Sequence, residues 1–132
     1  MRKQYHIRDS ERGVLAWDID RLLRLTSEQK PVDLPLERVL ELDEAFWFSG
    51  DGDAPTCRRV EEHTKLINET SLDHPIIIDP EERVMDGMHR VCKALISGLK
   101  TIKAVKLLAM PEPGFVGVPI DQLPCSRPSS PR

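Results

Sequence analysis

The chain has few cysteines, and their placement argues against the usual cysteine-based frameworks. Among 132 residues there are three, Cys57, Cys92 and Cys125, which lie far apart and form no C-x-x-C pair. An odd number of isolated cysteines argues against a disulfide framework and against a structural zinc site, which needs four ligands. We therefore predict no structural metal site, and we expect a reducing, cytoplasmic location.

Long apolar runs and a strong charge of either sign are also missing. The sequence has no stretch of about 18 apolar residues, so we expect no membrane span. The N-terminal sequence MRKQYHIRDSERG is charged and has no apolar segment of the kind found in secretory signals, so we expect no such signal. The formal net charge of −3 provides no overall attraction to nucleic acid, and a local basic patch stays an open alternative.

What is present suits one small domain followed by an arm. A length of 132 residues is typical of a single domain, and 39% hydrophobic residues support one modest core. We place the domain at residues 1–110 and leave the order of its first 15 or so residues open. The proline-rich residues 111–132 are predicted to form an irregular arm, disordered from about residue 126.

Periodicity and end signals predict an α+β fold, a small mixed β-sheet with packed helices. Asp18 opens one helical pattern, Thr56 is a suitable N-cap for the next, and Gly98 is a natural helix end. Short runs rich in β-branched residues predict strands. The predicted helices cover about 18–26, 57–69 and 88–97, and the predicted strands cover 32–36, 75–79, 83–85 and 100–109. Near the first strand, the expected core residues are Leu36, Val39, Leu40 and Leu42.

The stretch HPIIIDPEERVMDGMHRVCKA, residues 74–94, is the centre of the functional prediction. Asp86 is favoured as the N-cap of the following helix, with a magnesium ligand as its other candidate role. Gly87 permits a sharp turn and close approach of a ligand. The helix start at Met88 offers unpaired N–H groups and a positive dipole end, and His89 and Arg90 add side-chain donors. This arrangement predicts an anion site, with a nucleotide phosphate as the favoured anion.

The residues Gly87-Met88-His89-Arg90, between a strand and a helix, match a G-x-[HR]-R motif. With the surrounding elements from about residue 59 to 107, they resemble the ParB/sulfiredoxin-like superfamily. Sulfiredoxin activity would require a reactive cysteine where Met88 stands, and a thioether cannot form the thiolate nucleophile. Full ParB proteins continue with a DNA-reading helix pair, for which the proline-rich residues after the last predicted strand leave no room.

Among the relatives implied by this resemblance, the free serine kinases have the most similar motif. The resemblance implies an α+β fold that binds a nucleotide, ATP or CTP with Mg²⁺, and NTPase or small-molecule kinase activity as candidate reactions. Phosphoryl transfer depends mainly on charge neutralisation and positioning. A glutamate would serve as base, and both Glu41 and Glu44 stay candidates, with Glu44 and His89 taken as the catalytic pair. Trp47 or Phe48 is then expected either to close the core or to flank a bound base.

Three other interpretations stay open. A non-catalytic, DNA-associated or regulatory module would present a basic face built from Arg58, Arg59, Lys93, Lys100 and Lys103. A nuclease would need several carboxylates around a cation, whereas Asp79, Glu81 and Glu82 are predicted to form a solvated turn. A purely structural interpretation has Arg90 paired with Asp79 or Asp86. His63 is predicted to pack, and the base, acceptor, protein partner and oligomeric state are left open.

Overall fold

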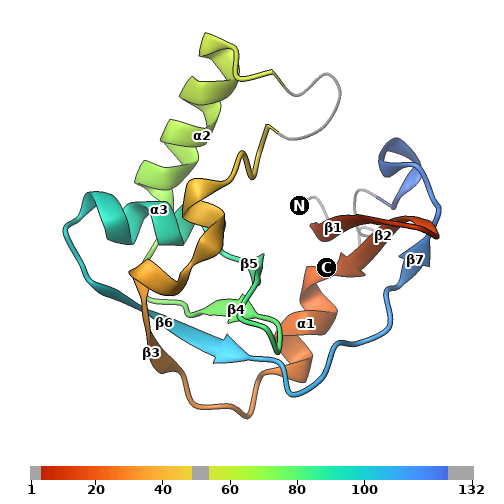
Figure 1. Cartoon of the computed structure of the whole chain (residues 1–132), viewed down its shortest axis with the longest axis horizontal. Helices are drawn as coiled ribbons and strands as arrows, with labels where there is room; N and C mark the ends of the chain where they lie inside the picture. The colour runs from red at the N-terminus through yellow and green to blue at the C-terminus, as the bar shows by residue number, and fades with distance from the viewer. Residues whose placement is uncertain (1–3, 49–53, 125–132) are drawn as a thin grey trace, which may run out of the picture. The chain divides into compact units, whose positions relative to one another are not determined.

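The computed structural model describes residues 4–48 and 54–124, and the chain divides into two compact units (Figure 1). The first unit combines residues 1–28 with residues 109–132, and the second spans residues 29–108. The chain returns to the first unit at residue 109, and the single domain expected over residues 1–110 stays a prediction. The disorder predicted from residue 126 lies outside the described residues.

The first unit is built on a hairpin that the sequence analysis did not predict. Strands β1 (Tyr5–Ser10) and β2 (Gly13–Asp18) pair antiparallel, and β2 also pairs with β7 (Phe115–Val116). Gly13 has φ of 93°, which a tight hairpin turn requires and which side chains with a Cβ rarely adopt. Residues 111–124, predicted as an irregular arm, thus contribute a strand and a short 3₁₀ turn, η3 (Ile120–Gln122), to this unit.

Helix α1 (Ile19–Leu25) confirms the first predicted helix. Asp18 is its N-cap, because its carboxylate accepts a hydrogen bond from the backbone N–H of Asp20. Leu22 is fully buried, and the Thr26 hydroxyl donates to the Leu22 carbonyl at the last turn. The helix is therefore capped at one end and anchored on one apolar face, as the amphipathic pattern indicated.

The second unit contains a mixed four-stranded sheet in the order β3-β6-β4-β5. Its strands are β3 (Val32–Pro35), β4 (Ile76–Ile78), β5 (Val84–Asp86) and β6 (Thr101–Lys106). The central pair β4 and β6 is parallel, and the two outer pairings are antiparallel. The predicted α+β fold with a small mixed sheet is confirmed, and each of the four strands lies within or beside its predicted range.

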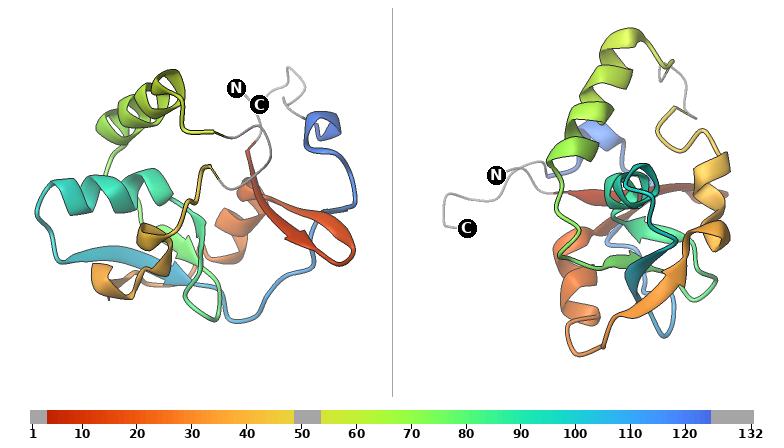
Figure 2. Two further views of the ribbon diagram at one scale, coloured as in Figure 1. Left: turned by 45° about the horizontal axis from the view of Figure 1, so that its top comes forward. Right: turned by 90° about the vertical axis from the view of Figure 1, so that its left-hand side faces the viewer.

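Two helices accompany this sheet, α2 (Cys57–Glu69) and α3 (Met88–Ile96). The bounds of α2 are those predicted, and the Thr56 hydroxyl caps it by accepting from the Arg59 N–H. Figure 2 shows α3 lying between the sheet and α2. This explains why α3 buries residues in the core whereas α2 buries none completely.

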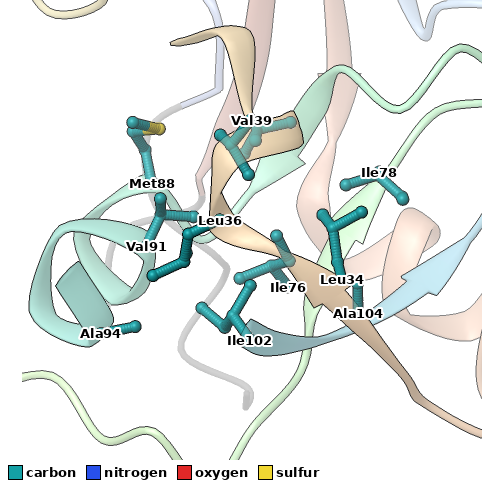
Figure 3. Close-up of a cluster of buried hydrophobic side chains, with 11 residues drawn as sticks. Leu34, Leu36, Val39, Ile76, Ile78, Met88, Val91, Ala94, Ile102 and Ala104 are labelled. Atoms are coloured by element: carbon teal, nitrogen blue, oxygen red, sulfur yellow. The ribbon is translucent and has the colours of Figure 1, made fainter. Parts of the chain in front are cut away.

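The core of the second unit lies between the sheet and α3 (Figure 3). Ile76, Val91 and Ala94 are fully buried at its centre. Two short 3₁₀ turns, η1 (Leu36–Arg38) and η2 (Leu40–Asp43), close one side. Of the residues expected there, Leu36 and Val39 are buried and Leu42 packs partly against the cluster. The expectation for Leu40 is wrong: it is 59% exposed, because the 3₁₀ turn directs it outward.

Candidate functional site at the start of helix α3

Gly87 is the residue on which the geometry of the α3 start depends. It occupies the N-cap position with φ of 109°, in the left-handed region that favours glycine. A Cβ at this position would lie 2.6 Å from Cγ2 of Ile76 and 2.9 Å from Nη2 of Arg90. Both the backbone angle and the space therefore require glycine, and the Arg90 guanidinium lies directly beside the helix start.

The predicted N-cap role of Asp86 is wrong. Asp86 is the last residue of β5, paired with Ile77, and Gly87 stands between it and the helix, with no side-chain cap at all. Because an N-cap must directly precede the first helical residue, the left-handed glycine displaces Asp86 from that role. The Asp86 carboxylate instead lies 3.2 Å from Nη2 of Arg90. Its other candidate role, as a magnesium ligand, stays a prediction.

Arg90 folds back over the start of its own helix. Its Nη2 donates to the carbonyl of Pro75 and to the carboxylate of Asp86, each at 3.2 Å. The side chain is 16% exposed, and its Nε atom is buried with no hydrogen-bond partner among the described residues. Arg90 therefore retains a donor that is unused, and a buried donor without a partner is energetically costly.

The carboxylate of Asp79 was predicted to lie in a solvated turn, and this prediction is wrong. Asp79 is 2% exposed. Its Oδ1 accepts hydrogen bonds from the backbone N–H groups of Glu81 and Arg83, at 2.8 and 2.9 Å. Its carboxylate therefore closes the turn between β4 and β5 from inside, because buried turn amides need an acceptor. Only Glu81 is fully on the outside, since Glu82 is partly covered and pairs with Arg38.

The two candidate glutamates meet at Arg83 rather than at the helix start. Glu41 is 2% exposed, and its Oε2 accepts the backbone N–H of Val84 at 2.7 Å and lies 3.2 Å from Nε of Arg83. Glu44 lies at the surface, with Oε1 2.6 Å from Nη2 of Arg83. The hydrogen bond that Arg83 donates to Glu44, supported by the negative charge of Glu41, raises the pKa of Arg83 against the lowering effect of burial. Both glutamates thus hold the beginning of β5, and the assignment of Glu44 as base stays a prediction.

His89, in the first turn of α3, belongs to a cluster of rings that the sequence did not reveal. Its Nε2 lies 3.0 Å from Nδ1 of His63 on α2. Trp47 stacks on both imidazoles, with ring centroids 4.3 Å from His63 and 4.6 Å from His89. Phe48 meets His63 edge-on. We call Trp47, Phe48, His63 and His89 the ring cluster.

The ring cluster is electrically neutral near neutral pH. Burial lowers the pKa of His89 to about 4, and the neighbouring charges of His63 and Arg90 act in the same direction. Burial and the charge of Arg59 also lower the pKa of His63, opposed by Glu62. His63 was expected to pack, and it does; its bond to a residue 26 positions away has no signal in the sequence.

The structure also shows the contacts of Met88 in the motif and of two lysines in the proposed basic face. Met88 is 6% exposed, and its side chain lies in the core, so only its backbone can meet a ligand. Of the proposed basic face, Lys93 donates to the carbonyls of Asn68 and Thr70, and Lys103 pairs with Asp33. Among the described residues, no group of three or more histidine, cysteine, aspartate or glutamate side chains is placed to hold a metal ion.

Comparison with known proteins identifies no relative. No protein family, curated protein or solved structure matches this chain significantly. Within the described part of the chain, no helix is long and apolar enough to cross a membrane. The chemistry of the α3 start is therefore the basis on which a function can be argued.

Proposed function

We propose that this protein binds a nucleotide through its phosphate groups at the first turn of α3. The single observation that carries the proposal is the helix start itself: Gly87 brings the backbone in without a side-chain cap, and the guanidinium of Arg90 lies beside it. The first bond along the helix runs from the Val91 N–H to the Gly87 carbonyl. The N–H groups before Val91 thus lack partners within the helix, at its positive dipole end.

Arg90 supplies a cation at the same place. Its guanidinium lies against Gly87, and its Nε has no hydrogen-bond partner among the described residues. A bound oxyanion would supply acceptors for this group, since guanidinium groups bind phosphate through several N–H donors at once. The Asp86 carboxylate occupies part of that guanidinium. A phosphate bound here would either share the Arg90 guanidinium with Asp86 or take the place of Asp86 on it. A magnesium ion between Asp86 and the phosphate would remove the repulsion between the two anions.

The ring cluster supports a nucleotide over a simple phosphate. Trp47 is partly exposed, and it lies against His89 in the turn that would hold the phosphate. Aromatic faces stack on nucleobases, and one stacked base contributes about 1–3 kcal/mol. The resemblance to the ParB/sulfiredoxin-like superfamily adds the expectation of ATP or CTP, and hydrolysis or transfer of the terminal phosphoryl group is the candidate reaction. His89, next to Arg90, is our candidate for a proton-accepting residue in such a step.

A thermal-shift panel tests this proposal. The parent chain is melted with ATP, ADP, CTP, GTP and pyrophosphate, with and without Mg²⁺. A ligand at a hundred times its dissociation constant stabilises the folded state by about 2.7 kcal/mol, a shift of several degrees for a domain of this size. We expect at least one nucleotide to produce such a shift.

The matched variants are Arg90→Ala and Arg38→Ala. Arg38 pairs with Glu82 on the same unit but lies outside the proposed site. Because Arg90→Ala also removes the bonds to Pro75 and Asp86, the comparison is made on the ligand-induced shift and not on the melting temperature itself. We expect Arg90→Ala to abolish the shift and Arg38→Ala to retain it. No shift of the parent chain at millimolar ligand, or equal shifts in both variants, would contradict the proposal.

The DNA-associated alternative receives no comparable observation. Two residues of the suggested basic face, Lys93 and Lys103, are engaged within the protein. Binding to DNA through phosphate contacts falls steeply with salt, whereas binding of a small nucleotide at one site depends on it weakly. A salt series with duplex DNA therefore separates the two functions.

A further inference from the structure

The two histidines of the ring cluster share one hydrogen. With Nδ1 of His63 and Nε2 of His89 3.0 Å apart, one nitrogen must donate and the other must accept. The two rings are inclined by only 23°, and Trp47 lies over both at 16° and 15°. One indole therefore covers a nearly flat pair of imidazoles that comes from two different helices.

The number of protons decides whether this arrangement can persist. A neutral pair keeps its N–H···N bond, and so does a pair that has gained one proton. With two added protons both nitrogens carry hydrogen, so the bond is lost and two positive charges face each other at 3.0 Å. A single imidazolium can still stack on an indole, but the two rings must separate, so Trp47 can no longer cover both.

The charged groups around the pair come from both helices. On α2, Arg59 disfavours and Glu62 favours the charged form of His63. On α3, Arg90 disfavours the charged form of His89. The third packed segment contributes Trp47 and Phe48, which carry no charge. The surroundings thus hold the pair in its bonded form at neutral pH and oppose the second proton.

We infer that the His63–His89 pair is a proton-dependent contact that holds Trp47 and α2 against the first turn of α3, and that full protonation of the pair releases Trp47 from it. The inference rests on the proposed function in one respect: the turn that is uncovered is the proposed phosphate site. An anion bound there favours the protonated imidazoles, and protonation in return favours the anion, because coupling between two binding events is reciprocal. Anion binding and release of Trp47 are therefore coupled.

Nuclear magnetic resonance of the full chain, without phosphate, tests the contact directly. The imidazole nitrogens of His63 and His89 and the indole N–H of Trp47 are followed from pH 7.5 to 3. We expect the pair to gain its protons in two steps below the ordinary histidine pKa of 6.5, and the Trp47 signal to shift with the second step.

Two variants make the result specific. His63→Phe keeps an aromatic ring against Trp47 but removes the shared hydrogen and one of the two imidazoles, so Trp47 should stay on His89 at low pH and its large low-pH shift should be lost. His74→Gln, an exposed histidine of the same unit, should leave the titration unchanged. Independent titration of His63 and His89 near pH 6.5, or an unchanged Trp47 signal, would overturn the inference. So would simultaneous loss of the methyl signals of Ile76 and Ile102, which would show unfolding instead.

A second series with pyrophosphate separates this inference from the proposed function. If pyrophosphate binds, the midpoint of the protonation step that releases Trp47 should rise by about one pH unit, as expected for an anion near a histidine. Binding with an unchanged midpoint would overturn the coupling. If pyrophosphate does not bind and the pair still titrates together with Trp47, the proton-dependent contact stands and the proposed phosphate site fails.

Discussion

The two ends of β5 are built from similar residues and yet differ in what they leave unused. At its beginning, the carboxylates of Glu41 and Asp79 accept the backbone N–H groups of Val84 and Arg83. At its end, Gly87 provides no side-chain cap, and the buried Nε of Arg90 has no partner among the residues that the structure describes. At the first end the carboxylates accept hydrogen bonds from the backbone, whereas at the second end N–H donors have no partner among the described residues.

Buried atoms that lack a hydrogen-bond partner show the same difference between the two ends. Within the described residues, two buried side-chain atoms lack a partner, Oε1 of Glu41 and Nε of Arg90. The first is an acceptor whose carboxylate is already paired with Arg83, and the second is a donor beside a helix N-terminus. Only the second lies where the dipole also attracts negative charge. The difference teaches that charged residues around one short strand can stabilise the fold at one end and be poised for a ligand at the other.

The largest expected effect is at the structural end. Glu41→Ala removes the buried acceptor for Val84 and the partner of Arg83, and we expect a loss of about 3 kcal/mol in the free energy of unfolding, because breaking a buried pair leaves its partner uncompensated. Urea unfolding measures this. Glu44→Ala removes the exposed partner of the same arginine and should cost at most about 1 kcal/mol. Equal losses in both variants would show that burial of Glu41 does not matter.

Substitution of the helix-start glycine should have the next largest effect. Gly87→Ala combines a φ of 109° with a Cβ only 2.6 Å from Ile76, and we expect a loss of about 2 kcal/mol. Gly98→Ala is the matched control, since φ is 79° there but nothing lies within 4 Å of the added Cβ. Its cost should be about 1 kcal/mol, from the backbone angle alone. A larger loss of unfolding free energy for Gly98→Ala than for Gly87→Ala would contradict the close approach of Ile76 to Gly87.

The free energy of unfolding should depend on pH because His89 in the ring cluster has a lowered pKa. The pKa of His89 is lowered to about 4 in the folded protein from 6.5, so the folded state binds fewer protons than the unfolded state between these values. Stability is therefore fully present above pH 6.5 and decreases as the pH falls toward 4, with a slope of at most about 1.4 kcal/mol per pH unit and less because the ring is partly solvated. Urea unfolding of the parent and of His89→Phe, compared at pH 7 and 5, measures it. Equal pH dependence in both proteins would contradict this role of His89.

The smallest expected effect is at the ligand end. Asp86→Asn removes the carboxylate that shares Arg90, so we expect pyrophosphate without magnesium to bind roughly two- to fivefold more tightly, equivalent to about 0.5–1 kcal/mol. With magnesium the gain should shrink, because Asp86 is then the candidate metal ligand. Titration calorimetry under both conditions measures the difference. Weaker binding without magnesium would show that Asp86 positions Arg90 instead of competing for it.

Much of the second unit was predictable because its signals are local. Thr56, Gly98 and the run Ile76–Ile78 each act within a few residues of the chain, and the helix and strand that they indicate are present. The prediction for Asp86 failed although its signal was also local. A carboxylate before a glycine has two candidate partners, the helix start and an arginine four residues on, and only the conformation of Gly87 selects between them.

The sequence alone determined the α+β composition, the glycine turn and the helix that follows it, because apolar periodicity and backbone freedom are properties of neighbouring residues. The tertiary structure alone decided three things. It buried Glu41 against Val84, it paired Gly13–Asp18 with Phe115–Val116, and it placed His63 on His89 under Trp47. These contacts join segments far apart in the chain, and which distant surfaces meet depends on how the whole core packs.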